Sequence, residues 1–458
     1  MSVAGDLGAF LTGTGAAELP NQAIDHAAML IASTIASAAF GSGLESAAII
    51  RSLARERGGR PDAAVWFDAG DRLPVADAAQ VNAVMSDAAA CDDSDLRNIV
   101  HCGTPLAATA LAIAERTGAG GEDVLAAIVL GYEAAGRIGE AITPGFRERG
   151  FHGCLVAIFA AAVAAARLLH LEARQMAQAI ALSATSIGGL AAAANTSVAR
   201  EYHAGLATLL GINAALAAGR GFIAEEGILE APQGFFVAYG GVDPIWAGVG
   251  VTRDLGQSWD IVTDMAVKLV PGGHPHHALA EAAANAAREG RIAPDEIDSI
   301  TLSRPGVTAL AGPLHPSDLI DMAHSPAYFL AAGAADRDFS WVHATPAKIT
   351  DPVIHRLIDK VRIGPAPRDD DIARYRQGAT VTIRTADGRT SASTVHVPRG
   401  AGMLGIAWTD IDAKCRALLP QAGITDRRID DILALIHRFR GLARAAMVTD
   451  LLDPVRRD

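Results

Sequence analysis

One short stretch of the chain combines a cation and three imidazoles with residues that force a turn. It runs from Lys268 to His277 and reads Lys-Leu-Val-Pro-Gly-Gly-His-Pro-His-His. Its prolines and glycines cannot continue a helix or pair as a central strand. The alanine-rich run from Ala278 predicts a helix, and the free N–H groups at a helix start favour a carboxylate. The stretch indicates an anion-binding and proton-transfer site. A glycine–proline connector with incidental surface histidines is the alternative.

Further side chains that suit acid–base chemistry lie between apolar segments earlier in the chain. They are Asp93, His101, Arg149, His152, Arg200 and His203. Histidine has an ordinary pKa near neutrality, and arginine binds carboxylates through paired N–H groups. Each has a structural alternative, such as a solvated acidic turn for Asp93, a bond to buried backbone for His152, or a surface ion pair for Arg200.

The composition limits the classes of partner. The chain has 458 residues, with 51 acidic residues against 39 lysines and arginines, a formal net charge of -12 and no basic run. Because phosphate binding needs clustered cations, we expect no nucleic-acid partner. An acidic chain that binds acids must concentrate its few cations locally, which draws attention to Lys268, Arg200 and Arg149.

The cysteines and the apolar segments bear on the compartment. The four cysteines are scattered, with no CxxC pair, which excludes a disulfide scaffold and a zinc ribbon and favours reduced thiols. The N-terminus lacks the basic region of a signal peptide. The longest apolar run, 154–166, is too short to cross a bilayer. We therefore expect a cytoplasmic protein without a membrane partner.

Helical periodicity dominates the first part of the chain, and a mixture of helical and strand-like patterns follows the 268–277 turn. The predicted helices cover 27–40, 45–55, 75–90, 106–116, 123–141, 153–169, 172–194 and 206–219. Residues 297–304 alternate like a strand, and 379–397 form a hairpin by pattern, with Asp387-Gly388 at its turn. Helical texture returns at 411–418 and 429–452.

These textures predict a mainly α protein with two domains. The first is a large all-helical domain made of residues 1–266 together with 407–458. The second is a smaller α/β lid domain over residues 267–406. The polar loops of the helical domain are expected to converge at one end of its helices.

A series of motifs occurs in a recognisable order along nearly the whole chain. They are Asp92-Asp93 with His101, Gly131-Tyr-Glu, Arg137-Ile-Gly, Arg149-Gly-Phe-His152, Tyr202-His-Ala-Gly205, Lys268 with Pro271 and His277, and His324-Ser-Pro-Ala-Tyr328. Together they resemble the MmgE/PrpD family, which includes 2-methylcitrate dehydratases, cis-aconitate decarboxylases and iminodisuccinate epimerases. The resemblance implies a helical domain, an α/β lid domain with the site between them, and a homodimer. It also implies small di- or tricarboxylate substrates and no metal or organic cofactor.

The match to the family is incomplete at single residues. His101 and Asp93 match the family's histidine and one of its paired aspartates, and His277 matches a widely shared histidine. Three positions differ: Ala90 stands where an acidic residue is usual, Arg200 where lysine is usual, and Gly273 where the decarboxylase members place a histidine. The difference at Gly273 argues against decarboxylation.

The family's reactions move a proton on a carbon next to a carboxylate. Such a site needs a base tuned toward neutral pH and cations that hold the carboxylate. We assign proton transfer to His101 and His277, and the sequence leaves open which of them is the base. Tyr328 would donate a proton or a hydrogen bond, and Asp93 would orient an imidazole.

The remaining candidates would bind the substrate. Lys268 and Arg200 would hold its carboxylates, Arg200 with two parallel hydrogen bonds. Further candidates for the lining of the pocket are His274, His152, His203 and Arg149.

The leading interpretation is a cofactor-independent lyase that dehydrates a small hydroxy di- or tricarboxylate resembling 2-methylcitrate. The alternatives are an epimerase or racemase of a dicarboxylate resembling iminodisuccinate, a decarboxylase, and a non-catalytic carboxylate-binding homologue. A metal site at His274 and His276 with Asp93 is a further alternative, but histidines across a proline turn lack the usual ligand spacing. We therefore expect neither a metal nor another cofactor.

Overall fold

The computed structural model describes residues 2–186, 188–368 and 371–453. The chain divides into two compact units: unit 1 comprises Met1–Val267 and Ala407–Asp458, and unit 2 comprises Lys268–Ile406. The domain boundaries predicted after residues 266 and 406 lie within one residue of these divisions. Residues 1 and 454–458 of the predicted helical domain lie outside the described residues.

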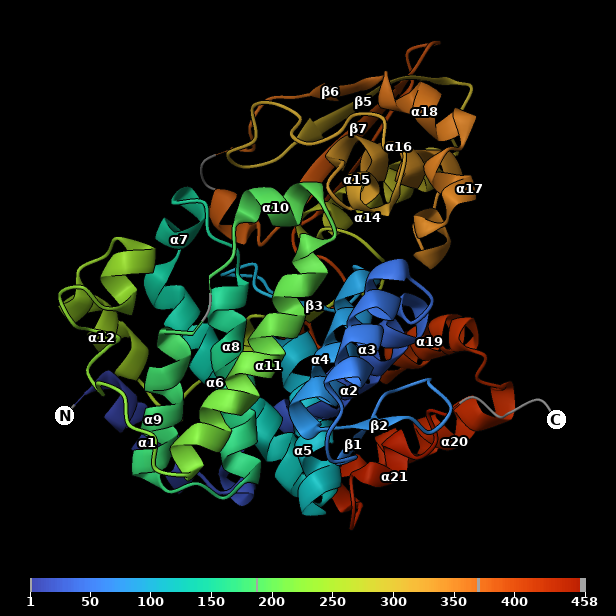
Figure 1. The fold of residues 1–458 in the computed structure, drawn as a ribbon. Coiled ribbons are helices and arrows are strands. Elements are labelled where there is room, and N and C mark those ends of the chain that lie inside the picture. The colour runs from blue at the N-terminus through green and yellow to red at the C-terminus, as the bar shows by residue number, and fades with distance from the viewer. Residues whose placement is uncertain (1, 187, 369–370, 454–458) are drawn as a thin grey trace. The chain divides into compact units, whose positions relative to one another are not determined.

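Unit 1 is built from helices that pack side by side (Figure 1). Its longer helices are α1 (Val3–Gly13), α2 (Asn21–Gly41), α3 (Glu45–Arg57), α4 (Val75–Ala88), α5 (Gly103–Thr117), α6 (Gly121–Ile142), α8 (Cys154–Leu168), α9 (Ala173–Ala184), α11 (Ala199–Gly219), α12 (Pro244–Thr252), α19 (Trp408–Leu418) and α20 (Asp426–His437). Its shorter helices are α7 (Gly145–Glu148), α10 (Ala191–Thr196), α13 (Asp260–Thr263) and α21 (Ala446–Thr449). The prediction of a mainly α protein is confirmed.

Helix α8 lies inside unit 1, packed against α5, α6 and α11. Every residue of α8 except Arg167 is buried. Glycines let the neighbouring helices approach closely. A Cβ atom on Gly211 of α11 would lie 2.7 Å from the carbonyl oxygen of Ile158, and one on Gly131 of α6 would lie 2.9 Å from that of Ala160. The small side chains of α8 and these glycines therefore produce a dense interior.

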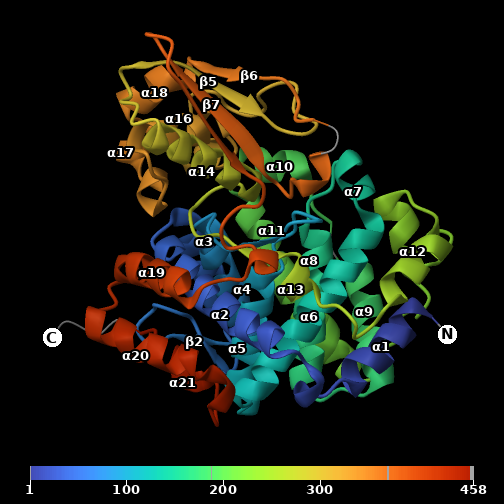
Figure 2. The same cartoon turned by 180° about the vertical axis from the view of Figure 1, so that it is seen from behind.

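Helix α2 is the other long apolar helix of unit 1. By length and composition it could cross a membrane, but 89% of its apolar window is buried inside the structure. It packs against α4, α5, α19 and α20, and Figure 2 shows α19 and α20 beside it. It therefore acts as a core helix, and the chain returns after unit 2 to cover it.

Two predicted helices are interrupted in the structure. The helix predicted over 172–194 is α9 followed by α10, and residue 187 lies outside the described residues. Before α10, the carbonyl of Gly189 accepts a hydrogen bond from the N–H of His152 at 2.9 Å, and Leu190 pairs with Phe151. This pairing overrides the local helical propensity. The helix predicted over 429–452 is α20, a 3₁₀ turn (Phe439–Gly441) and α21.

Two further features of unit 1 differ from the prediction. Helix α11 begins at Ala199, so Arg200 and His203 lie in its first turns rather than in a preceding loop. Two short antiparallel pairs interrupt the all-helical pattern: β1 (Ala63–Ala64) with β2 (Arg72–Leu73), and β3 (Asp93–Asp95) with β4 (Met265–Val267). Strands this short have no alternation that a sequence pattern can reveal.

Unit 2 contains a four-stranded sheet in the order β6-β5-β7-β8. Its strands are β5 (Ile297–Ser303), β6 (Val361–Ile363), β7 (Ala379–Thr385) and β8 (Thr390–Val395). Strands β5 and β6 are parallel, and the other neighbours are antiparallel, with β7 and β8 forming the predicted hairpin. The helices are α14 (His274–Glu289), α15 (Leu319–Ala323), α16 (Pro326–Asp336), α17 (Pro346–Ile349) and α18 (Pro352–Ile358).

The core of unit 2 lies between its sheet and helices α14 and α16. Alternate residues of β7, including Val381 and Ile383, are buried in this core. Helix α14 begins at His274, with Pro275 in its first turn, where a missing N–H costs nothing. The three histidines of the 268–277 turn therefore lie in the first turn of α14.

Candidate functional site

Strand β3 positions His101 in unit 1. Asp93 pairs with Val267 of β4, and Nδ1 of His101 donates a hydrogen bond to the carbonyl oxygen of Asp93 at 2.6 Å. Because Nδ1 carries the proton, Nε2 is the basic nitrogen of the neutral ring. The side chain of His101 is 20% exposed, so the ring remains accessible to a small molecule.

The carboxylate of Asp93 makes other contacts. It accepts hydrogen bonds from the N–H of Gly103 at 2.8 Å and from the hydroxyl of Tyr132 at 3.1 Å. A Cβ atom on Gly103 would lie 2.7 Å from Oδ1 of Asp93, so the bond needs glycine there. A carboxylate oxygen of Asp92 lies 3.5 Å from Nδ1 of His101. Asp93 thus holds the imidazole through its backbone carbonyl, whereas the sequence had indicated its carboxylate for this role.

His152 and His203 face one another through their Nδ1 atoms, which are 3.3 Å apart. Burial lowers the pKa of His152 well below its ordinary value, and neighbouring groups that can carry a positive charge lower it further. These groups are His101, His203, Arg200 and Arg147. The pKa of His203 is also lowered by burial, although Asp87 opposes the shift. The structure therefore brings together His101, His152, Arg200 and His203, which we call the unit 1 cluster.

Arg200 is held by a buried acid that the sequence did not reveal. Its Nε atom donates to Oδ2 of Asp87 at 2.8 Å, and its Nη2 atom donates to the carbonyl oxygen of Asp87 at 2.7 Å. Burial lowers the pKa of Arg200, but the carboxylates of Asp87, Glu201 and Asp92 more than reverse this effect and raise it. The Nε–Nη2 edge is occupied, which leaves Nη1 without a hydrogen bond to any residue that the structure describes.

Arg149 lies apart from the contacts of the unit 1 cluster. It is exposed, and its guanidinium lies beside Gly241, where a Cβ atom would be 3.0 Å from Nη1. Arg147, from the same loop, is the arginine whose charge acts on His152. Its Nη2 atom donates to the carbonyl oxygen of Ile99 at 3.2 Å.

In unit 2, His277 is 6% exposed and lies in the first turn of α14. Its ring bonds to the backbone of Gly272. Its Nε2 atom has no hydrogen-bond partner among the described residues, so Nδ1 makes the bond to Gly272. Burial lowers the pKa of His277 well below its ordinary value, and the charges of His274, Lys268 and His276 lower it further. The ring is therefore neutral, with the lone pair on Nε2.

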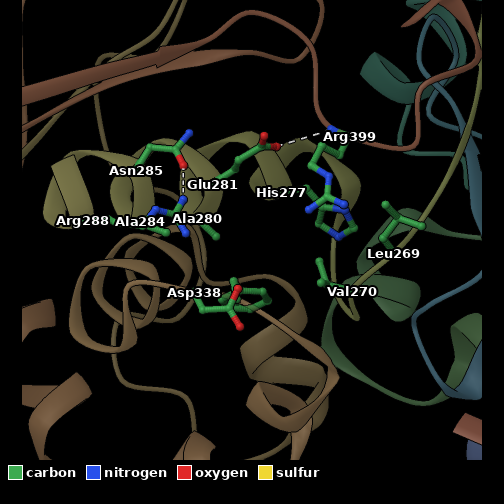
Figure 3. Close-up of a pocket in the computed structure, with 11 residues that line it drawn as sticks. Leu269, Val270, His277, Ala280, Glu281, Ala284, Asn285, Arg288, Asp338 and Arg399 are labelled. Carbon is green, nitrogen blue, oxygen red and sulfur yellow. Dashed lines mark hydrogen bonds between the residues drawn. The ribbon is translucent and has the colours of Figure 1, made fainter. Parts of the chain in front are cut away.

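A pocket of ≈ 250 Å³ lies beside His277 and is lined only by residues of unit 2 (Figure 3). Helix α14 supplies one wall through His277, Glu281 and Arg288, and Arg399 and Asp338 come from other segments. The N–H of Arg399 donates to the carboxylate of Glu281 at 3.4 Å. The pocket therefore joins a neutral imidazole to two arginines and two acids.

The other predicted residues of unit 2 pack around this pocket or in the core. Lys268 is 2% exposed, and the ring of His274 stacks on that of His277 with centroids 4.7 Å apart. Tyr328 is fully buried in the core, and its hydroxyl donates to the carbonyl oxygen of His343 at 2.9 Å. Burial raises the pKa of Tyr328 above its ordinary value. This arrangement gives Tyr328 a packing role and engages the hydroxyl that the sequence had indicated as a donor.

Sequence reasoning missed several groups that the structure places at these sites. They are Asp87, Arg147, Cys154, Arg288 and Arg399. Arg399 follows strand β8 between a proline and a glycine, and a lone cation in such a turn was the available signal. Among the described residues, one group of three side chains brings potential metal ligands within 4.8 Å of one another: His152, Cys154 and His203.

Comparison with known proteins places these sites in a family context. The family model for the MmgE/PrpD N-terminal domain matches residues 5–245, and that for the MmgE/PrpD C-terminal domain matches residues 271–437. Both candidate sites contain residues that fall inside these matches.

Among curated proteins, the chain is similar to fungal relatives. It is 26% identical over 295 residues to the cis-aconitate decarboxylase-like protein oryM of Aspergillus oryzae, and this match covers 61% of each chain. It is 27% identical over 205 residues to a cis-aconitate decarboxylase of Aspergillus terreus, and this match covers 42% of each chain. The matches thus span less than two thirds of these relatives' length.

Proposed function

Because the chain belongs to the MmgE/PrpD family, we propose that it is a cofactor-independent lyase acting on a small hydroxy di- or tricarboxylate. The reaction removes a proton next to a carboxylate and expels a hydroxyl group as water. The substrate class resembles 2-methylcitrate.

The state of His277 is the observation that carries this proposal. Removal of a proton from carbon needs a neutral base with an available lone pair. The bond from Nδ1 to Gly272 fixes the tautomer, and Nε2 is left without a partner among the described residues in a ring that lines the pocket. The lowered pKa keeps this ring unprotonated at neutral pH. His277 therefore acts as the base in the proposed reaction.

Cations near His277 support a carboxylate substrate. Arg399 and Arg288 line the same pocket, and the positive charge of Lys268 acts on the imidazole. A guanidinium binds a carboxylate through charge-assisted hydrogen bonds and stabilises the negative charge that develops on it as the proton leaves. The pocket volume of ≈ 250 Å³ lies below the range of drug-sized sites, which suits a small acid.

The unit 1 cluster supplies the second proton-transfer group of the proposal. His101 has a fixed tautomer and an accessible ring, and it protonates the leaving hydroxyl when it carries its second proton. Asp87 occupies Nε and Nη2 of Arg200, so Nη1 is the donor that would bind a substrate carboxylate. The proposal includes the homodimer expected from the resemblance, and sedimentation at micromolar concentration tests that part separately.

Decarboxylation of an unsaturated acid is the second candidate, because the fungal relatives reported above are named as a cis-aconitate decarboxylase-like protein and a cis-aconitate decarboxylase. Gly273 stands where the decarboxylases were expected to carry a histidine, and the N-cap of α14 places it directly before His274. We therefore rank this reaction behind dehydration.

Proton NMR in D2O tests the proposal. The purified protein is incubated with 2-methylcitrate, citrate, malate, tartrate, iminodisuccinate and cis-aconitate, with the His277→Gln variant as the matched control. Loss of a C–H signal with a new vinyl signal supports dehydration. Loss of carbon dioxide from cis-aconitate establishes decarboxylation instead, and exchange with inversion establishes an epimerase. If acids bind but neither exchange protons with solvent nor convert, the proposal of an enzyme is overturned and a carboxylate-binding protein remains.

A further inference from the structure

Two imidazoles of the unit 1 cluster lie close to a neighbouring thiol, and together they offer three potential metal ligands. They belong to His152, Cys154 and His203, and all lie within 4.8 Å of one another. We propose that these side chains form a binding site for one thiophilic divalent cation, of which Zn²⁺ is the natural probe. The inference goes beyond the proposed lyase and does not depend on its substrate.

The separation of the imidazole nitrogens fits a metal ion. The Nδ1 atoms of His152 and His203 are 3.3 Å apart. Two nitrogens bound to tetrahedral zinc at about 2.0–2.1 Å are separated by about 3.3 Å. A thiolate at about 2.3 Å from the same ion would lie about 3.6 Å from each nitrogen. The sulfur of Cys154 and one ring nitrogen of each histidine lie within 4.8 Å of one another, close enough for a small movement of the side chains to complete three ligands.

The ligands stand on packed elements. Cys154 is the first residue of α8, His203 lies in the first turns of α11, and these helices pack against each other. His152 is held by the bond from its N–H to the carbonyl of Gly189 at 2.9 Å. A Cβ atom on Gly189 would lie 2.6 Å from the sulfur of Cys154 and 3.2 Å from Nδ1 of His203. Because Gly189 has no side chain, the sulfur of Cys154 and Nδ1 of His203 can occupy the space beside it.

The hydrogen bonds at the site show where a proton must move when an ion binds. The N–H of Cys154 donates to Nδ1 of His152, so His203 supplies the single proton between the two Nδ1 atoms. On metal binding that proton moves to Nε2 of His203, and both Nδ1 lone pairs face the ion.

The thiol must give up its proton to bind the ion. Cys154 is a buried free cysteine, and its metal-free side chain is a thiol. Binding forms one sulfur–metal bond and releases one proton to solvent, and the affinity therefore rises with pH. The positive charge of Arg200 is paired with Asp87 at 2.8 Å, which limits its repulsion of the ion.

The ligand set selects the kind of metal. One thiolate and two imidazoles suit Zn²⁺ and Co²⁺, whereas Mg²⁺ and Ca²⁺ prefer oxygen ligands. Three protein ligands leave a fourth position for water or another small oxygen ligand, as in catalytic zinc sites. An ion here would occupy His152 and His203 and so remove both imidazoles from the unit 1 cluster.

Cobalt titration of the chelator-treated full-length protein tests the site. We expect one equivalent of Co²⁺ to produce thiolate-to-cobalt charge-transfer absorption that one equivalent of Zn²⁺ abolishes. The Cys154→Ser and His203→Gln variants should bind Zn²⁺ more than about 100-fold more weakly, since even a partner that only orients a ligand contributes about 10–100-fold. Cys415→Ser is the matched control, because Cys415 is also a buried thiol of unit 1.

A second variant keeps the test independent of lost ligands. Gly189→Ala removes no ligand but places a methyl group against Cys154 and His203, so it should weaken Zn²⁺ binding while circular dichroism stays unchanged. The proposal is overturned if the wild-type protein shows no charge-transfer absorption. It is equally overturned if Cys154→Ser binds Zn²⁺ as tightly as the wild type and Cys415→Ser do.

Discussion

The Nδ1 atom of His101 donates its hydrogen bond to the backbone carbonyl of Asp93, at 2.6 Å, while the carboxylate of Asp93 is bonded to Gly103 and Tyr132. The imidazole is therefore held by the backbone of Asp93, while the side chain of Asp93 binds two other groups. This separates two roles that a paired aspartate and histidine would otherwise share.

The first prediction concerns these two residues. Asp93→Asn retains the carbonyl that holds His101 and one oxygen for Gly103, so kcat should fall by less than about tenfold. His101→Gln removes the proton-transfer group itself and should lower kcat by about 10²–10⁴-fold. Steady-state kinetics on the acid identified by NMR compares the two variants. Equal losses in both would return the orienting role to the carboxylate.

The second prediction concerns His277 as the base. His277→Gln should lower kcat by about 10²–10⁴-fold. His276→Gln is the matched control, because His276 also lies in the first turn of α14 and packs on Phe329, yet does not line the pocket. The pKa of His277 is lowered. The apparent pKa on the acid side of the pH profile of kcat/KM should therefore lie below the ordinary histidine value of 6.5. An apparent pKa above that value would exclude His277 as the titrating base.

The third prediction concerns Arg399. Arg399→Gln removes a charged donor from the pocket, which should cost about 1.5–3 kcal/mol of substrate binding. KM should therefore rise by roughly 10- to 150-fold, with a smaller change in kcat. Arg356→Gln, at an exposed position of α18, serves as the control. Unchanged KM in the Arg399 variant would place the carboxylate elsewhere.

The fourth prediction separates two roles of Arg200. Arg200→Gln leaves the carboxylate of Asp87 buried without its ion pair, which should destabilise the protein by about 3–5 kcal/mol. The double variant Arg200→Gln, Asp87→Asn should regain most of that stability in urea unfolding. KM should stay raised about 30-fold in both, which corresponds to about 2 kcal/mol for a lost charged contact. A wild-type KM in the double variant would make Arg200 purely structural.

The fifth prediction is a pH dependence of stability that arises at Asp95. Burial raises the pKa of Asp95 to about 6, and its Oδ2 atom has no hydrogen-bond partner among the described residues. Between about pH 4 and pH 6 the folded state keeps a proton that the unfolded chain has lost. The free energy of unfolding therefore falls as pH rises through this window, by an amount on the order of 3 kcal/mol.

Asp95→Asn tests this pH dependence. The amide oxygen still accepts the N–H groups of Arg97 and Asn98, which bond to Oδ1 of Asp95 at 2.8 and 2.9 Å. The variant should gain stability above pH 6 and lose the slope between pH 4 and pH 6 in urea unfolding. Asp431→Asn, at an exposed position of α20, should keep the slope. A slope that persists in Asp95→Asn would assign it to other groups.

Elements with strong local signals could be predicted from the sequence. The helix predicted over 45–55 is α3 (Glu45–Arg57), and the hairpin predicted around Asp387-Gly388 is β7 with β8. Helical spacing and turn residues are properties of neighbouring positions, so they are visible in one sequence. The turn at 268–277 was recognised for the same reason, although its histidines proved to be helical.

Contacts between distant residues could not be predicted in the same way. Arg200 and Asp87 are separated by 113 positions, and nothing local to either marks the pair. Helix α9 ends at Ala184, and the carbonyl of Gly189 beyond it bonds to the N–H of His152, a contact that local helical spacing does not reveal. The hydroxyl of Tyr328 is engaged by His343 through a fold that only the structure reveals.

The alanines of helix α8 are positions in the interior of unit 1 that tolerate loss of side-chain atoms but not gain. An alanine has only a methyl group to lose, so truncation leaves almost no void. A larger side chain, in contrast, has no room where Gly131 of α6 and Gly211 of α11 meet α8, because a Cβ atom on either glycine would already lie within 2.9 Å of a carbonyl oxygen of α8. Sequence drift at these alanines is therefore confined to exchanges among the smallest residues, and new catalytic variety has to arise in the loops and first turns at the ends of the helix.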